Sequence, residues 1–200
     1  LWDVFLTVNP DLQIVGSLDP VITACEQRSV AAASGCASTS GRLDCTNAYE
    51  DVGPFGLAIR SLKGRAHEHI QTEPFGDHTR LLNGWVEGSL LAFSRLAWTD
   101  VGPLDERFFL YSEEQDWQRR ARLKDWDIAQ VSTPLFVHAA KGSVSDNEAL
   151  QHLSDNMQEE SRRRYIQKWW GNRGLILYRC VLSLGSLAKR CFTRKFWRGA

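Results

Sequence analysis

The sequence predicts an α/β protein, a sheet combined with helices, that continues into a helical C-terminal extension. Apolar, β-branched runs alternate with segments of helical periodicity up to about residue 138. Beyond residue 145 the pattern is helical, and Gly174 separates two helical segments. With 43% hydrophobic and 24% charged residues, the composition is that of a globular chain and excludes a disordered or fibrous one.

The first part of the chain is predicted to form two strands and one helix. Trp2–Val8 is apolar enough for a buried strand, which Asn9-Pro10-Asp11 ends. Residues 17–27 open with a serine and an Asp-Pro pair, which favours a short helix. The run SVAAAS predicts another strand. Residues 35–81 are rich in Gly, Ser, Thr and Pro, so we expect long loops and short irregular strands there.

The second part contains the elements with the clearest patterns. Trp85–Phe93 is predicted to be one strand carrying Gly88, a glycine that often marks close approach of a ligand or backbone. Ser112 with Gln115 three residues later is a capping-box pattern. The expected elements are a short helix at 94–100, a helix at 113–124, a strand at 127–132, a loop approached by 136–138, and a long helix at 145–170.

Five carboxylates lie within residues 105–116, around the aromatic run Phe108-Phe109-Leu110-Tyr111. One interpretation is helix stability, because acids in a first turn and basic residues at 119–124 complement the helix dipole. The other is catalysis, because a helix N-terminus favours a charged carboxylate and lowers its pKa, which suits a general base. The local sequence leaves both open.

Asp11 and His138 each follow or end a predicted strand and are candidate ligands for a divalent ion. Taken singly, Asp11 also fits an ordinary turn residue, and His138 a hydrogen-bonded loop histidine.

The stretches TVNPDLQI and GWVEGSLLAF through HAAKGSVS, in this order, resemble the family 2 glycosyltransferases, in particular the bacterial rhamnosyltransferase-like branch. That branch reads Asn-Pro-Asp, then Trp-Val-x-Gly-Ala, then Asp-Glu-x-Phe-Phe-x-Tyr-x-Glu-Asp-x-Asp, then His-x-x-Gly-x-Ser. The resemblance covers residues 1 to about 145, is weak over 35–81, and is most specific over 85–145.

This resemblance implies a partial GT-A fold with a mixed sheet flanked by helices. It also implies an inverting, metal-dependent transfer of a sugar, with rhamnose the leading expectation, in cell-surface polysaccharide synthesis. The expected partners are a dTDP- or UDP-linked sugar donor and a glycan or polyprenyl-linked acceptor.

Site residues follow from the resemblance position by position. Glu114 stands at the general base, beside Glu113. Asp11 stands at the family's metal-binding acidic motif, and His138 at its metal- or diphosphate-contacting histidine, with Mn²⁺ or Mg²⁺ the expected ion. Glu114 replaces the commoner aspartate, Glu87 stands at a usually small polar position, and Pro103-Leu104 replaces Gly-Phe. The residues expected to bind or shape the substrates are Trp85, Glu87, Gly88, Asp105, Glu106 and Asp116.

Two domains are expected: residues 1–145, the C-terminal portion of a GT-A domain, and residues 146–200, a basic helical extension. From Arg162 onward there are eleven Lys and Arg and no Asp or Glu. The extension either packs on the domain or lies on the inner membrane face through residues 174–198. The expected location is cytoplasmic, with peripheral contact to the inner membrane face under the second alternative. No nucleic-acid recognition motif accompanies the charge, so nucleic acid is not an expected partner.

The chain opens inside an apolar strand, so the part that holds the nucleotide base is expected to precede Leu1. The alternative function is therefore a truncated, non-catalytic fragment that retains acceptor and metal-site residues. Five cysteines without a CxxC pair are expected to be reduced thiols.

Overall fold

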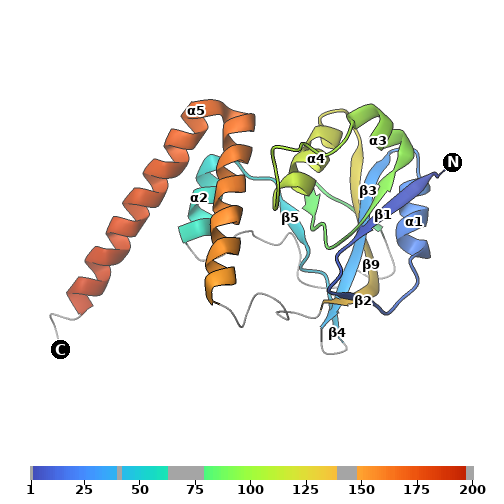
Figure 1. Cartoon of the computed structure of the whole chain (residues 1–200), viewed down its shortest axis with the longest axis horizontal. Coiled ribbons are helices and arrows are strands. Elements are labelled where there is room, and N and C mark those ends of the chain that lie inside the picture. Colours follow the sequence, from blue (N-terminus) through green and yellow to red (C-terminus); the bar gives the residue numbers. More distant parts are fainter. Residues whose placement is uncertain (1, 40–41, 63–78, 139–147, 197–200) are drawn as a thin grey trace. The chain divides into compact units, whose positions relative to one another are not determined.

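The computed structural model describes residues 2–39, 42–62, 79–138 and 148–196 (Figure 1). The chain divides into two compact units, one of Leu1–Asp51 with His69–Ser161 and the other of Val52–Glu68 with Arg162–Ala200. The expected domain boundary between residues 145 and 146 lies outside the described residues and stays a prediction.

The first unit is built on a mixed sheet. Within the described residues, seven strands form one sheet of order β1-β8-β3-β9-β2, with β4 beside β3 and β6 beside β9, while β5 and β7 form a separate pair. Strands β3 and β9 are parallel, and the other pairs are antiparallel. The elements are β1 (Val4–Val8), β2 (Leu12–Ile14), α1 (Asp19–Glu26), β3 (Val30–Thr39), β4 (Arg42–Asp44), β5 (Ala48–Glu50), α2 (Pro54–Leu62), β6 (Thr79–Leu81), β7 (Gly84–Val86), β8 (Leu90–Ser94), α3 (Arg95–Val101), α4 (Glu113–Arg122), β9 (Asp127–His138) and α5 (Glu148–Phe196).

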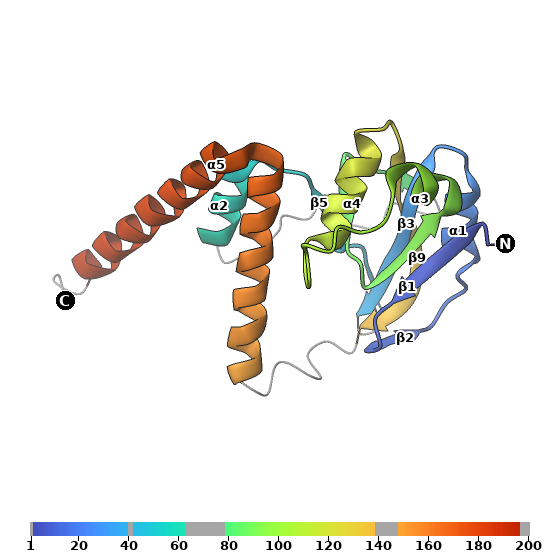
Figure 2. The same cartoon turned by 45° about the horizontal axis from the view of Figure 1, so that its top comes forward.

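The sheet buries both of its faces, and β8 shows how. Successive side chains of a strand point to opposite faces. Leu90 and Ala92 join the core beneath α1, whereas Leu91 and Phe93 join the core that contains Trp117 of α4. Helices α1 and α4 lie on opposite sides of the sheet (Figures 1 and 2). The predicted class, an α/β sheet flanked by helices with a C-terminal helix, is confirmed.

The predicted single strand Trp85–Phe93 is wrong, because a turn at Glu87–Ser89 divides it into β7 and β8. Strand β7 pairs with β5, and β8 pairs with β1 and β3. Apolar residues lie on both sides of the turn, which is why the sequence predicts a single strand. This turn places Gly88 where a third element, α4, approaches it.

The prediction of loops and short irregular strands over residues 35–81 is partly wrong. Strand β3 continues to Thr39, and α2 forms where Pro54 can start a helix and Leu57 and Ala58 are buried. Residues 63–78 lie outside the described part of the chain. Residues 136–138, predicted to approach a loop, are the last residues of β9.

The predicted capping box at α4 is also wrong. Ser112 has a left-handed backbone (φ 69°) and makes no side-chain cap hydrogen bond; its carbonyl oxygen accepts from the Asp116 N–H at 2.9 Å instead. Tyr111 is left-handed too (φ 68°). Two consecutive left-handed residues turn the chain sharply into α4, so its first turn begins directly at Glu113.

The second unit contains α2 and most of α5. Its buried side chains include Leu57, Tyr165, Ile166 and Tyr178. Helix α5 is kinked at Gly171 (φ 62°), three residues before the predicted break at Gly174. Among the described residues, no helix is both long and apolar enough to cross a membrane.

Reduced thiols are the wrong expectation for two cysteines, because Cys36 and Cys45 form a disulfide. Strand β4 folds back on β3 with Ala37 opposite Asp44, so the flanking residues Cys36 and Cys45 are brought face to face. Cys25 is a free thiol, and burial raises its pKa to about 12.

We expect Gly16→Ala to destabilise the fold by roughly 1–3 kcal/mol. A Cβ at Gly16 would lie 2.4 Å from the Pro134 carbonyl oxygen, where β9 backbone leaves no room. Gly53→Ala is the matched control, because a Cβ there meets no atom within 4 Å. Urea unfolding of both variants checks this, and equal midpoints would contradict the close approach of residues 16 and 134.

Candidate functional site

The Asn9-Pro10-Asp11 turn lies beside the turn that precedes β8. Strand β1 pairs with β8 so that Val8 is opposite Leu90, and the Asn9 N–H donates to the Ser89 carbonyl oxygen at 2.8 Å. Asp11 is exposed on this turn. The sheet register therefore brings the Asn-Pro-Asp turn next to Gly88 at one edge of the sheet.

His138 belongs to the same edge by its backbone. It is the last residue of β9 and pairs with Leu12, the residue directly after Asp11. The His138 side chain is outside the described part of the structure. Among the described side chains, no group of three or more His, Cys, Asp or Glu could hold a metal ion. The register thus supports Asp11 and His138 as neighbours, while their role as metal ligands stays a prediction.

Gly88 lies directly against Glu114, in the first turn of α4. A Cβ built on Gly88 would be 3.3 Å from Cγ and 3.4 Å from Cβ of Glu114. The absence of a side chain at residue 88 therefore lets α4 approach the turn. This approach brings the Glu87 carboxylate close enough to act electrostatically on Glu114, as the adjacent Glu113 does.

Burial and like charge raise the pKa of Glu114 to about 8. Loss of hydration is the largest cause, the neighbouring Glu113 carboxylate is next, and Glu87 adds to it. Backbone N–H groups of Glu114 and Gly88 oppose the rise. Burial also raises the pKa of Glu113. Among the described groups, one carboxyl oxygen of each residue, Oε2, is buried without a hydrogen-bond partner.

The expectation that the helix N-terminus lowers the pKa of this carboxylate is therefore wrong. Burial together with two nearby acids outweighs the helix dipole. The helix-stability interpretation fails for Glu113 and Glu114, because a raised carboxyl pKa means that the ionised form destabilises the folded chain.

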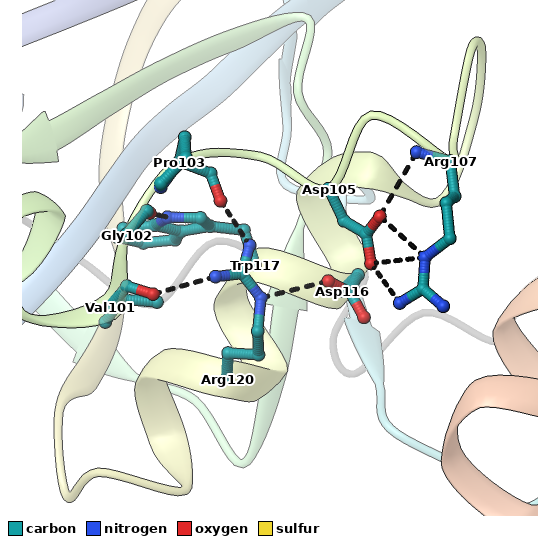
Figure 3. A network of polar contacts seen from close by, with 8 residues as sticks. All are labelled: Val101, Gly102, Pro103, Asp105, Arg107, Asp116, Trp117 and Arg120. Atoms are coloured by element: carbon teal, nitrogen blue, oxygen red, sulfur yellow. Dashed lines mark hydrogen bonds and ion pairs between the residues drawn. The ribbon is translucent and has the colours of Figure 1, made fainter.

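Asp105 and Asp116 are held in ion pairs, which Figure 3 shows. Asp105 pairs with Arg107 at 2.6 Å, and Asp116, fully buried, pairs with Arg120 at 3.0 Å. Arg120 also donates to the carbonyl oxygens of Val101 and Pro103, and the Trp117 indole N–H donates to that of Gly102. These bonds fix the approach to α4.

The other expected substrate contacts occupy two different environments. Glu106 is exposed on the loop before α4. Trp85 is 4% exposed and stacks on Tyr49, with ring centroids 4.7 Å apart. Neither environment identifies a ligand, so substrate binding by Trp85, Glu106, Asp105 and Asp116 stays a prediction.

Sequence reasoning missed Gln118 and Asn47. Gln118 bonds to the backbone of Val86, and the Asn47 carbonyl oxygen accepts from the Glu87 N–H at 2.8 Å. Gln118 had one available signal, since it lies four residues after Glu114 and so on the same helix face. No sequence signal indicated Asn47, because its contact with Glu87 depends on the pairing of β5 with β7.

Comparison with known proteins relates this chain to glycosyltransferases. No family model matches it. It is similar to the N-acetylglucosaminyl-diphospho-decaprenol L-rhamnosyltransferases of Mycobacterium tuberculosis strains CDC 1551 / Oshkosh and ATCC 25618 / H37Rv, with 29% identity over 120 residues in each case. The match covers 56% of this chain and 39% of each relative, so it spans well under half of the relatives' length.

We expect Glu114→Gln to gain stability relative to the wild-type chain as the pH rises from 4.5 to 8. The folded chain holds the Glu114 proton up to about pH 8, whereas the unfolded chain releases it near 4.5, so wild-type stability falls across this window. The difference in unfolding free energy between Glu114→Gln and the wild type should widen by roughly 2–4 kcal/mol up to about pH 8 and then stay constant. Urea unfolding at several pH values measures it.

Glu26→Gln, at an exposed position on α1, is the matched control. If the stability difference between Glu114→Gln and the wild type did not change with pH, the Glu114 carboxyl would be neither buried nor close to other acids.

Proposed function

We propose that this chain is part of an inverting family 2 glycosyltransferase of cell-surface polysaccharide synthesis. It would transfer a sugar, rhamnose being our leading choice, from a dTDP- or UDP-linked donor to a glycan or polyprenyl-linked acceptor. The mycobacterial relatives are named for rhamnosyl transfer onto a decaprenol-linked acceptor, which supports this choice. The observation that carries the proposal is the buried Glu114 carboxyl beside Gly88 and Glu113.

Glu114 is assigned the role of general base. Its carboxylate takes the proton of an acceptor hydroxyl as the hydroxyl oxygen attacks the anomeric carbon, and the bond to the nucleoside diphosphate breaks on the opposite face. A single displacement of this kind inverts the configuration. A base with a pKa of about 8 is mostly protonated at neutral pH, so its ionised fraction performs this step, and that fraction binds the transferred proton more firmly than an ordinary glutamate does.

Asp11 and His138 would hold a divalent metal ion. A carboxylate and an imidazole at neighbouring backbone positions are a donor set that suits Mn²⁺, and the carboxylate also suits Mg²⁺. Such an ion, when bound, would neutralise charge on the departing diphosphate. The residues of this chain contribute the edge of the sheet at which donor and base can meet.

The C-terminal helix is proposed to contact the inner face of the cell membrane, which would bring a polyprenyl-linked acceptor to the site. The support is an exposed apolar set on α5, comprising Ile176, Leu177, Leu184 and Leu187 at 45–67% exposure, in a segment without acidic residues. Basic residues of this segment suit anionic lipid headgroups.

Glu114→Gln in the full-length protein should lower kcat by about 10²–10⁴-fold, because the amide cannot accept the hydroxyl proton. Binding of UDP or dTDP with Mn²⁺, followed by calorimetry, should stay close to that of the wild type. Glu114→Asp should keep part of the activity and Glu26→Gln all of it. Unchanged turnover of Glu114→Gln would remove Glu114 from this role.

A second candidate function rests on the short span of the match, 39% of each relative. This is a non-catalytic fragment that keeps the acceptor and metal-site residues. Calorimetry on the 200-residue chain itself separates the two, because a non-catalytic fragment would bind neither UDP nor dTDP in the presence of Mn²⁺.

A further inference from the structure

Gln118 makes an unusual pair of bonds to a single backbone residue. Its Oε1 accepts from the Val86 N–H at 2.8 Å, and its Nε2 donates to the Val86 carbonyl oxygen at 2.8 Å. Both residues are fully buried. A buried amide is stable only when its polar atoms are paired, and here one side chain satisfies both backbone groups of one residue.

These two hydrogen bonds between Gln118 and Val86, here called the clamp, lie between two parts of the candidate site. Val86 directly precedes Glu87 and Gly88, and Gln118 lies one helical turn after Glu114 on the same face of α4. The clamp therefore fixes the separation between the turn that carries Gly88 and the helix that carries Glu114.

The same turn is restrained from its other side by Asn47. The Glu87 N–H donates to the Asn47 carbonyl oxygen at 2.8 Å. The Asn47 side chain in turn donates to the Gly35 carbonyl oxygen and accepts from the Gln130 amide at 2.6 Å. This anchor ties the turn to β3 and β9 but does not reach α4. Gln118 provides hydrogen bonds between β7 and α4.

The two Gln118 hydrogen bonds are not needed merely to attach α4 to the sheet. Trp117 and Ala121, on either side of Gln118, are fully buried in the core shared with Phe93 and Ile128. That packing supplies the apolar burial that attaches a helix. The Gln118 amide adds a positional restraint, because its two directional hydrogen bonds hold the Val86 backbone at one position along the axis of α4.

We propose that Gln118 is a positioning residue, which holds Glu87 and Gly88 against the Glu114 side chain through the peptide of Val86. This inference rests on the general-base role proposed for Glu114. Without the clamp, the turn moves away, water reaches the Glu114 carboxyl, and Glu87 separates from Glu113 and Glu114. The elevated pKa of Glu114, which burial and the neighbouring acids produce, then falls toward its ordinary value.

The test is Gln118→Met in the full-length protein, a change that keeps the side-chain length and removes both hydrogen bonds. Gln151→Met, at an exposed helical glutamine, is the matched control. We expect kcat to fall about 10–100-fold, the donor KM to change less than about twofold, and the pH midpoint of kcat to move down by about one unit. The control should match the wild type in all three.

A readout independent of transfer keeps the inference testable on an inactive protein. The measured quantity is the difference in unfolding free energy that Glu114→Gln causes, followed from pH 5 to 9. In the Gln118→Met background this difference should widen at most half as much as in the wild-type background. If Glu114→Gln retains activity but this difference shrinks, the base assignment fails and the positioning role stands.

Gln118→Leu serves as a second variant if Gln118→Met does not fold, because it also removes both hydrogen bonds without adding a charge. Its kcat and pH midpoint should fall as in Gln118→Met, again with the donor KM little changed. A folded variant with an unchanged pH midpoint and an undiminished stability difference would overturn the inference.

Discussion

The site depends on one constraint, the burial of the Glu114 carboxyl beside two further acids. Three carboxylates that interact, two of them with a buried oxygen, cannot all be ionised at neutral pH at low free-energy cost. The fold maintains this arrangement because the later turns of α4 are firmly attached to the core. Trp117 packs edge-on against Phe93 and stacks on Trp98, with ring centroids 4.9 and 5.7 Å apart. Apolar burial in the later turns thus offsets electrostatic repulsion in the first turn.

Successive residues of α4 serve different purposes. Asp116 and Arg120 hold the loop that enters the helix, Trp117 and Ala121 fill the core, and Gln118 contacts β7. Arg119 and Arg122 pair with Asp51, which follows β5, so the later turns are attached to a distant segment of the chain. Glu113 and Glu114 are left at the start of the helix, where the left-handed pair Tyr111-Ser112 turns the chain toward Gly88.

Much of the fold could be predicted from the sequence, because β1, α1, α3 and α4 have clear local patterns of apolar and charged residues. The prediction that β1 is buried is wrong, because β1 stands at the end of the strand order and its side chains are half-buried or exposed. What could not be predicted depends on partners far away in the chain. The division of residues 85–93 follows from the different pairing of β7 and β8, and the Cys36–Cys45 disulfide follows from the register of β4 on β3. The site shows the same contrast. Glu114 could be selected by resemblance, but the direction of its pKa depends on burial and on Glu87, which no local pattern reveals.

The most direct test is a ¹³C NMR titration of the glutamate side-chain carboxyls, with the Glu114→Gln spectrum used to assign the Glu114 signal. The account predicts a Glu114 midpoint near pH 8 and a smaller second step in the same signal as Glu113 titrates. A single midpoint near the ordinary glutamate value of 4.5 would contradict it, because it would show a hydrated carboxylate free of its two acidic neighbours.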